Sequence, residues 1–139
     1  MPKTNQLGLI EYIKYIGIIM KVTDFMVGDW AYVADYPMMR MPKQIECGHF
    51  VRSHCSFEGI PINELFLEKN GFVYDQKEQA FCFNENQVII QKCSDEENGV
   101  SLWRFVINSE MTIMDINIKY IHELQHAIKF SNIAKTIVL

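Results

Sequence analysis

The sequence predicts an α+β fold, in which helices pack on one side of antiparallel sheet. Short segments rich in β-branched and aromatic residues alternate with polar turns, which favours an antiparallel meander. The stretch YIHELQHAI, residues 120–128, has the apolar spacing of an amphipathic helix. With 139 residues, 49% hydrophobic and 22% charged, the chain is expected to form a single α+β domain over residues 20–139.

Residues 1–19 are expected to be an N-terminal extension, either a helix or the product of an upstream start site. The apolar stretch LGLIEYIKYIGIIM, residues 7–20, is too short and too charged for a membrane span, because Glu11 and Lys14 interrupt it. As a helix it would carry an apolar face that a second copy of the chain could cover. No signal-peptide pattern is recognised, so we expect a cytoplasmic protein with reduced cysteines and no membrane partner.

The first strands are expected after the Gly28-Asp29 turn, where WAYV, residues 30–33, has strand-forming side chains. A methionine-rich loop, PMMRMP, follows over residues 37–42. QIECGHFVR, residues 44–52, is predicted to form one or two short strands bent at Gly48. Small strands around a GDW turn favour a compact half-barrel of the SH3-like kind.

A short helix is predicted in PINELFLEKNGF, because Asn63 can cap it and Asn70-Gly71 can end it. The strands of the meander are then FVYD, QAFCF, QVIIQKC, VSLWRFVI and MDINIK. In MDINIK, apolar and polar residues alternate, as in a strand with one buried and one solvent-exposed face. The final amphipathic helix follows directly, and the TIVL at residues 136–139 could add a short strand.

HELQH, residues 122–126, matches the His-Glu-x-x-His pattern of zinc hydrolases. In such a site His122 and His126 would bind the metal, and Glu123 would act as the base on the metal-bound water. A zinc-dependent hydrolase is therefore one alternative function for this chain.

Two observations favour a structural helix instead. The thirteen residues after His126 include no His, Cys, Asp or Glu that could supply a third ligand. At about 100° per residue, both histidines lie about 160° from Leu124, the centre of the apolar face, and are predicted to face solvent. We therefore expect no catalytic residue, no bound metal and no cofactor, with zinc at His122 and His126 as the alternative.

Two further clusters contain residues that can bind metals. The first cluster has four side chains that can bind zinc, at Cys47, His49, His54 and Cys55. Their spacing does not match the usual pairs of zinc ligands, so we expect these side chains to pack in or beside a sheet. The acidic run DEEN, residues 95–98, lacks the loop spacing of a calcium site, and a solvated turn is expected there.

Nucleic-acid binding is a further alternative, through a small-barrel module that stacks bases on its aromatic side chains. The aromatic candidates are Trp30, Tyr32, Tyr36, Phe50, Trp103 and Phe105, and the nearby cations are Arg40, Lys43, Arg52 and Arg104. The formal charge of −4 argues against it, so packing in the core is expected instead. The flexible methionines of PMMRMP suit a protein partner as well as a core.

Three stretches resemble a family of small uncharacterised proteins of gut bacteria and their mobile elements: KVTDFMVGDWAYV, IPINELFLEKNGF and IKYIHELQHAIKFSNI. The resemblance covers most of residues 20–139 and implies no catalytic or binding residues. It implies that HELQH belongs to a C-terminal helix of the family type rather than to a peptidase. The expected function is a non-enzymatic accessory or interaction module, which binds a protein partner or a second copy of itself.

Overall fold

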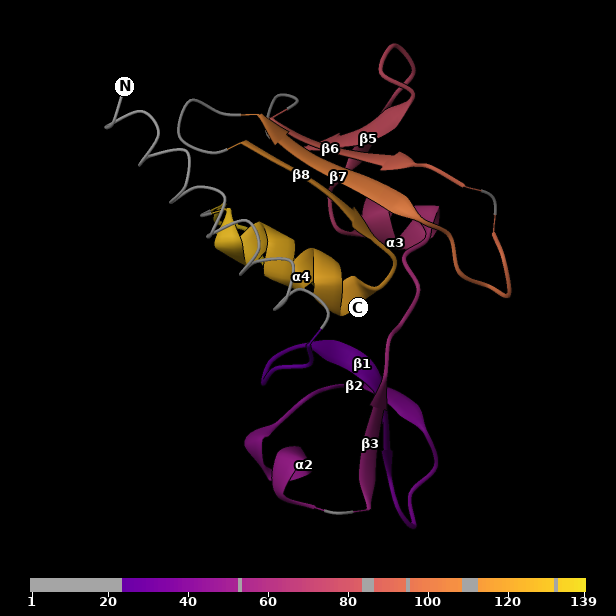
Figure 1. Ribbon diagram of the computed structural model, residues 1–139, viewed down its shortest axis with the longest axis vertical. Helices are drawn as coiled ribbons and strands as arrows, with labels where there is room; N and C mark the ends of the chain where they lie inside the picture. Colours follow the sequence, from indigo (N-terminus) through magenta and orange to yellow (C-terminus); the bar gives the residue numbers. More distant parts are fainter. Residues whose placement is uncertain (1–23, 53, 84–86, 95, 109–112, 132) are drawn as a thin grey trace, which may run out of the picture.

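The computed structural model describes residues 24–52, 54–83, 87–94, 96–108, 113–131 and 133–139. It contains a three-stranded and a five-stranded antiparallel sheet, with helix α4 (Ile121–Phe130) between them (Figure 1). The predicted α+β class is therefore confirmed. The expected extension over residues 1–19 lies outside the described residues.

The three-stranded sheet has the order β2-β1-β3, and its strands are β1 (Trp30–Asp35), β2 (Met41–Gln44) and β3 (Cys55–Glu58). The chain enters β1 through Gly28, whose φ of 93° lies in the left-handed region that favours glycine. Side chains alternate along β1: Ala31 and Val33 enter a small core with Ile45, whereas Trp30 and Tyr32 pack toward α4 and the larger sheet. This sheet thus has two apolar faces, and α4 covers one of them.

The prediction of bent strands at residues 44–52 is partly wrong, because Cys47–Val51 forms the short helix α2. Local hydrogen bonds stabilise it. The Glu46 N–H donates to Nδ1 of His49 over 2.9 Å, and the His49 N–H donates to the Glu46 carbonyl over 3.0 Å. A helix of five residues is too short to show the 3.6-residue period that would identify it in the sequence.

The connection to the larger sheet contains α3 (Glu64–Lys69), and the predicted caps are confirmed. Asn63 Oδ1 accepts the Phe66 N–H over 2.8 Å, and Gly71 after the helix has a φ of 86°.

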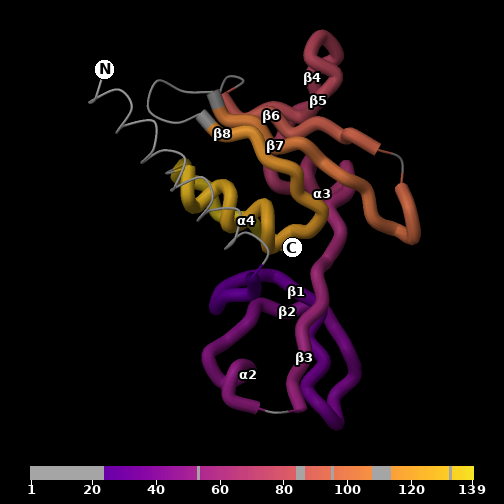
Figure 2. Tube along the Cα trace, in the orientation of Figure 1, coloured from indigo at the N-terminus to yellow at the C-terminus, as the bar shows by residue number. Residues whose placement is uncertain are grey.

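The five predicted strands form one meander in chain order, as the continuous path in Figure 2 shows. They are β4 (Val73–Asp75), β5 (Ala80–Phe83), β6 (Val88–Lys92), β7 (Trp103–Asn108) and β8 (Ile113–Ile118). In β8, Met114, Ile116 and Ile118 are buried, while Asp115 and Asn117 are exposed, as the alternation predicts. One face of the meander therefore forms the main core with α3 and α4.

The chain after α4 runs back across the molecule without forming the strand expected at TIVL. It is still held in place, since the Ile137 carbonyl accepts from Nε1 of Trp30 over 3.2 Å, and Asn70 bonds both backbone groups of Val138. Among the described residues, no helix is both long enough and apolar enough to cross a membrane.

Candidate functional site

Helix α4 is buried on two faces, which corrects the prediction for its histidines. Ile121, Leu124 and Ala127 pack on the meander as expected. His122 and His126, predicted to face solvent, are each only 2% exposed, and the segment before β1 contacts both, through Phe25 and Asp29. The helical wheel located the apolar face correctly but could not reveal a second surface supplied by a distant segment.

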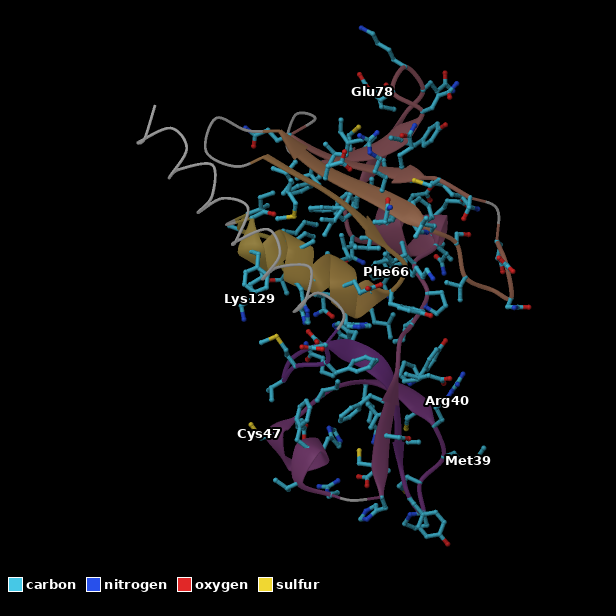
Figure 3. The ribbon with its side chains drawn as sticks, viewed as in Figure 1. Met39, Arg40, Cys47, Phe66, Glu78 and Lys129 are labelled. Carbon is cyan, nitrogen blue, oxygen red and sulfur yellow. The ribbon has the colours of Figure 1, made fainter. Side chains whose placement is uncertain are left out.

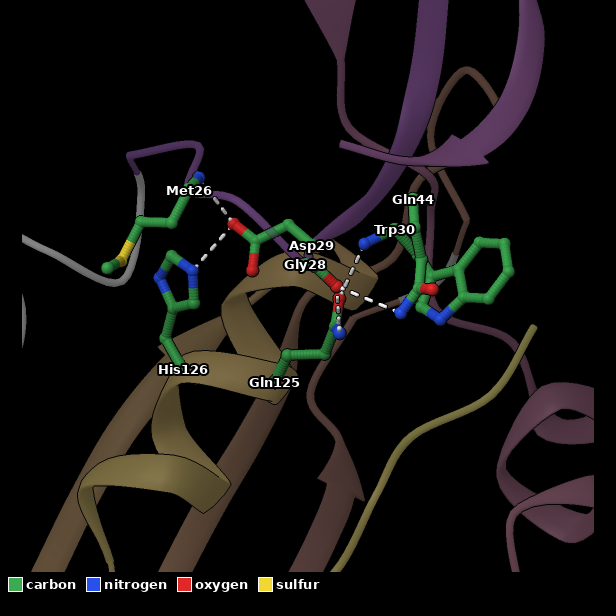
Figure 4. Close-up of polar contacts among 7 residues, drawn as sticks. All are labelled: Met26, Gly28, Asp29, Trp30, Gln44, Gln125 and His126. Carbon is green, nitrogen blue, oxygen red and sulfur yellow. Dashed lines mark hydrogen bonds and ion pairs between the residues drawn. The ribbon is translucent and has the colours of Figure 1, made fainter. Parts of the chain in front are cut away.

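His126 pairs with Asp29 in this second interface (Figure 4). His126 Nε2 lies 2.7 Å from Asp29 Oδ2, and the two side chains are 3% and 6% exposed. The same carboxylate oxygen accepts the Met26 N–H over 2.7 Å. A buried carboxylate is costly unless such partners satisfy it, so this contact fixes the turn on the helix.

Gln125 makes a second link between the same two segments (Figure 4). Its Oε1 accepts the Trp30 N–H over 2.8 Å, and its Nε2 donates to the Gly28 carbonyl over 3.2 Å. Gln44 from β2 donates to the same carbonyl over 3.2 Å. The Gly28 carbonyl and the Trp30 N–H are therefore bonded by side chains, while the Gly28 N–H donates to the Ile45 carbonyl over 2.8 Å.

Glu123 caps the start of α4. Its Oε1 accepts the N–H groups of Lys119 and Tyr120 over 2.9 and 3.0 Å. Burial raises the pKa of this carboxyl above its ordinary value, and the two backbone bonds and the nearby Lys119 and His126 oppose that rise. The residue that would be the base in a hydrolase is thus bound to the helix terminus.

His122 lies in an aromatic stack. Its ring centroid is 4.2 Å from that of Phe25 and 5.9 Å from that of Tyr120. The two imidazoles of the motif are 6.0 Å apart and nearly perpendicular. Within the described ranges, no three His, Cys, Asp or Glu side chains come together as a metal ion would require. The contacts of HELQH therefore fit a structural joint between two sheets.

A cavity of about 630 Å³ lies beside this joint. The turn at residues 26–29, the last turns of α4 and residues 133–137 line it. Lys129, on the outer side of α4 in Figure 3, contributes a cation to the wall. A cavity of this size is large enough for a small molecule, and its lining is of mixed polarity.

The four residues of the other candidate zinc cluster are distributed over two elements. Cys47 and His49 lie on α2, where Cys47 is exposed (Figure 3) and His49 is buried against the Glu46 backbone. His54 pairs through Nε2 with Asp35 Oδ1 at 3.1 Å, and Cys55 begins β3. Both histidines are therefore engaged by protein groups, His49 by the Glu46 backbone and His54 by Asp35.

The aromatic residues considered for base stacking do not share one surface. Trp103 and Phe105 are buried in the meander, Trp30 and Tyr32 are half-buried, and Tyr36 and Phe50 are exposed on the small sheet and α2. In the acidic run, Glu96 and Glu97 are exposed, as expected for a turn, and Asp95 lies outside the described residues.

Sequence reasoning missed Asp29 and Gln125 as site residues. One signal was present: the face of α4 opposite the core carries His122, Gln125 and His126, which are easier to bury than lysine or glutamate. No protein-family model matches the chain, and the searches of curated proteins and of solved structures find no match either.

Proposed function

We propose that this protein is a non-enzymatic interaction module of the cytoplasm, which binds a protein partner through the hairpin that joins β1 to β2. The observation behind the proposal is the exposure of four large apolar side chains within six residues. Tyr36, Met38, Met39 and Met41 are 77%, 59%, 86% and 44% exposed. Apolar side chains gathered in this way are typical of a surface that a partner covers.

The hairpin residues also have suitable chemistry. Methionine side chains are flexible and polarisable, so they adapt to a partner of irregular shape. Arg40, between them, lies 4.3 Å over the ring of Tyr32 and pairs with Glu58. The hairpin thus combines exposed methionines with an arginine that is held in place, and both residue types are enriched at protein interfaces.

The contacts of HELQH support a non-enzymatic role. Glu123 is engaged by two backbone N–H groups, and His126 is engaged by Asp29. In the hydrolase alternative these same groups would have to face a metal and its bound water.

The cytoplasmic location and the association with bacterial mobile elements remain part of the proposal. All four cysteines are free, which is typical of proteins in reducing compartments.

The interface is tested with a purified partner. Partners cross-linked to the full chain in cells are identified, purified and titrated against wild type and Met38→Ser/Met39→Ser. We expect the double variant to bind at least about tenfold more weakly, whereas Val73→Ser, at an exposed position on the meander, binds as wild type does. Equal affinities for the two variants would refute the hairpin as the interface.

The non-enzymatic part of the proposal is tested by metal analysis of protein purified without a histidine tag. We expect zinc far below one ion per chain. Stoichiometric zinc that is lost on His126→Ala would overturn the proposal in favour of a metalloenzyme.

A further inference from the structure

We propose that a second cavity, which shares no lining residue with the one beside the α4 joint, binds a small organic ammonium ion that also carries a hydrogen-bond acceptor. The site is a cavity of about 500 Å³ between α3 and the inner face of the meander. Its walls include Glu64 and Glu68 of α3, Tyr74 of β4, Lys92 of β6 and Trp103 of β7. It shares no residue with the hairpin, so it stands independently of the interaction surface.

The indole of Trp103 is the observation that points to a ligand. Trp103 is 1% exposed, and its Nε1 has no hydrogen-bond acceptor within the described protein. The chain contains two tryptophans, and the other one, Trp30, donates from Nε1 to the Ile137 carbonyl. Buried donors are almost always matched by an acceptor. An oxygen brought by a molecule in the cavity would complete the bonding of Trp103.

Lys92 shows how the site accommodates an ammonium group. Its Nζ lies 3.5 Å from Glu64 Oε1 and 5.9 Å from the centre of the Trp103 ring. A smaller cavity of about 230 Å³ is also lined by Glu64, Lys92 and Trp103. A carboxylate beside an aromatic ring is an arrangement that recognises ammonium ions. The lysine thus occupies, from within the chain, the position that a ligand cation would take.

The charge balance of the wall favours a second cation. Glu68 is one helical turn beyond Glu64 and lines the same cavity. Like charges at this spacing repel each other, and among the described residues Lys92 is the one cation on this wall. Within the described part of the chain, Glu68 has no cation at salt-bridge distance. A ligand ammonium between the two carboxylates would neutralise the remaining charge.

The wall also has a movable part. The Lys92 side chain is 38% exposed, whereas Phe81 and Trp103 are fixed in the core. When Lys92 turns toward solvent, it leaves the face of the indole ring and frees Glu64. Tyr74, which is 50% exposed, adds an aromatic edge at the mouth. A molecule with an amine at one end and a hydroxyl or carbonyl at the other fits this order of groups.

The test uses aminopentanol, which carries an amine and a hydroxyl at opposite ends, with pentylamine and pentanediol as matched probes that lack one group each. Nitrogen-15-labelled full-length protein gives two indole N–H resonances in a ¹H–¹⁵N spectrum, one for each tryptophan. We expect aminopentanol to move the Trp103 resonance downfield with a Kd on the order of 1 mM. The Trp30 resonance stays in place, because its N–H already has an acceptor.

Variants separate the roles of the charged groups. Glu68→Gln is expected to weaken aminopentanol binding about fivefold, and Lys92→Ala to strengthen it, because Glu64 is released. Glu97→Gln, an exposed position in the turn before β7, is the control and is expected to bind as wild type does.

Three results would overturn the proposal: an unmoved Trp103 resonance at saturating probe, pentanediol that binds as tightly as aminopentanol, or a Lys92→Ala variant that binds more weakly. Pentylamine that binds without the downfield shift supports it, since the amine alone brings no acceptor to the indole.

Discussion

His126 Nε2 lies 2.7 Å from Asp29 Oδ2, although the two residues are 97 positions apart in the chain. The pair joins the turn before β1 to the middle of α4. It is buried between the two sheets, where water does not compete for either group. The contact therefore links the stability of the small sheet to the placement of the helix.

Removing either partner is expected to lower the free energy of unfolding, and the two losses are not expected to add. Asp29→Ala and His126→Ala should each lower the free energy of unfolding by about 3 kcal/mol, because each leaves the other polar group buried without its partner. The double variant should lose little more than either single variant. Urea unfolding followed by tryptophan fluorescence measures the free energy of unfolding of all three variants. The control is Asp24→Ala, at an exposed position in the same segment. Single effects that simply add would show that the two residues act independently.

Glu123 should give the protein a characteristic pH dependence. Burial raises the pKa of this carboxyl in the folded state, so the folded protein holds the proton more tightly than the unfolded chain. The stability contributed by this residue is therefore greatest at low pH, and it falls as pH rises through the window between the ordinary carboxyl pKa and the raised value.

Glu123→Gln removes this titration, and its amide oxygen can still accept the two backbone N–H groups. We expect the stability of wild type relative to this variant to decline as pH rises above about 4, the ordinary carboxyl pKa. Glu123→Ala also loses the cap, so it should be about 1 kcal/mol less stable than Glu123→Gln at every pH. Chemical denaturation across the pH range measures both, and a difference between wild type and Glu123→Gln that rises with pH would contradict the direction of the shift.

Gly59 should not tolerate a side chain. A Cβ at this position would lie 2.5 Å from the Tyr120 ring, in the segment where the Ile60 carbonyl accepts the Ile121 N–H. Gly59→Ala should therefore cost about 2 kcal/mol through overpacking. Tyr120→Ala in the same chain should recover part of the loss, which a thermal melt would detect. An unchanged melting temperature in the single variant would mean that the Tyr120 ring moves aside freely.

The cysteines should differ in reactivity. Burial, with Asp75 and Glu78 nearby, raises the pKa of the Cys82 thiol, whereas Cys47 and Cys93 are exposed. Because the thiolate is the reactive form, iodoacetamide should label Cys82 at least about tenfold more slowly than Cys93. Peptide mass spectrometry of the time course gives the rates, and labelling in urea is the control in which the difference disappears. Equal rates in the folded protein would indicate local opening of β5.

The elements that depend on local chemistry could be predicted from the sequence. The Asn63 cap and the alternation of Met114, Ile116 and Ile118 each lie within a few residues, and both are confirmed. The helix at Cys47–Val51 could not, because it has too few residues for a periodic pattern and depends on the Glu46 and His49 hydrogen bonds. Local patterns are informative only when they are longer than the period they reveal.

The site was harder to predict than the fold. A short motif identified His122, Glu123 and His126 as candidate site residues. The side chains that surround them come partly from a segment almost a hundred positions earlier in the chain. A helix with one apolar face is normally assigned one buried face. Burial of the second face depends on the turn at Gly28-Asp29, whose contact with the helix no local pattern specifies.

The place of α4 between two sheets also orders the folding of the chain. Both sheets are complete in sequence before this helix is synthesised. Until it emerges, Trp30 and Tyr32 on one side and the inner face of the meander on the other have no common surface to pack on. We therefore expect the two sheets to acquire their stability together, in a single cooperative step late in synthesis, rather than one after the other.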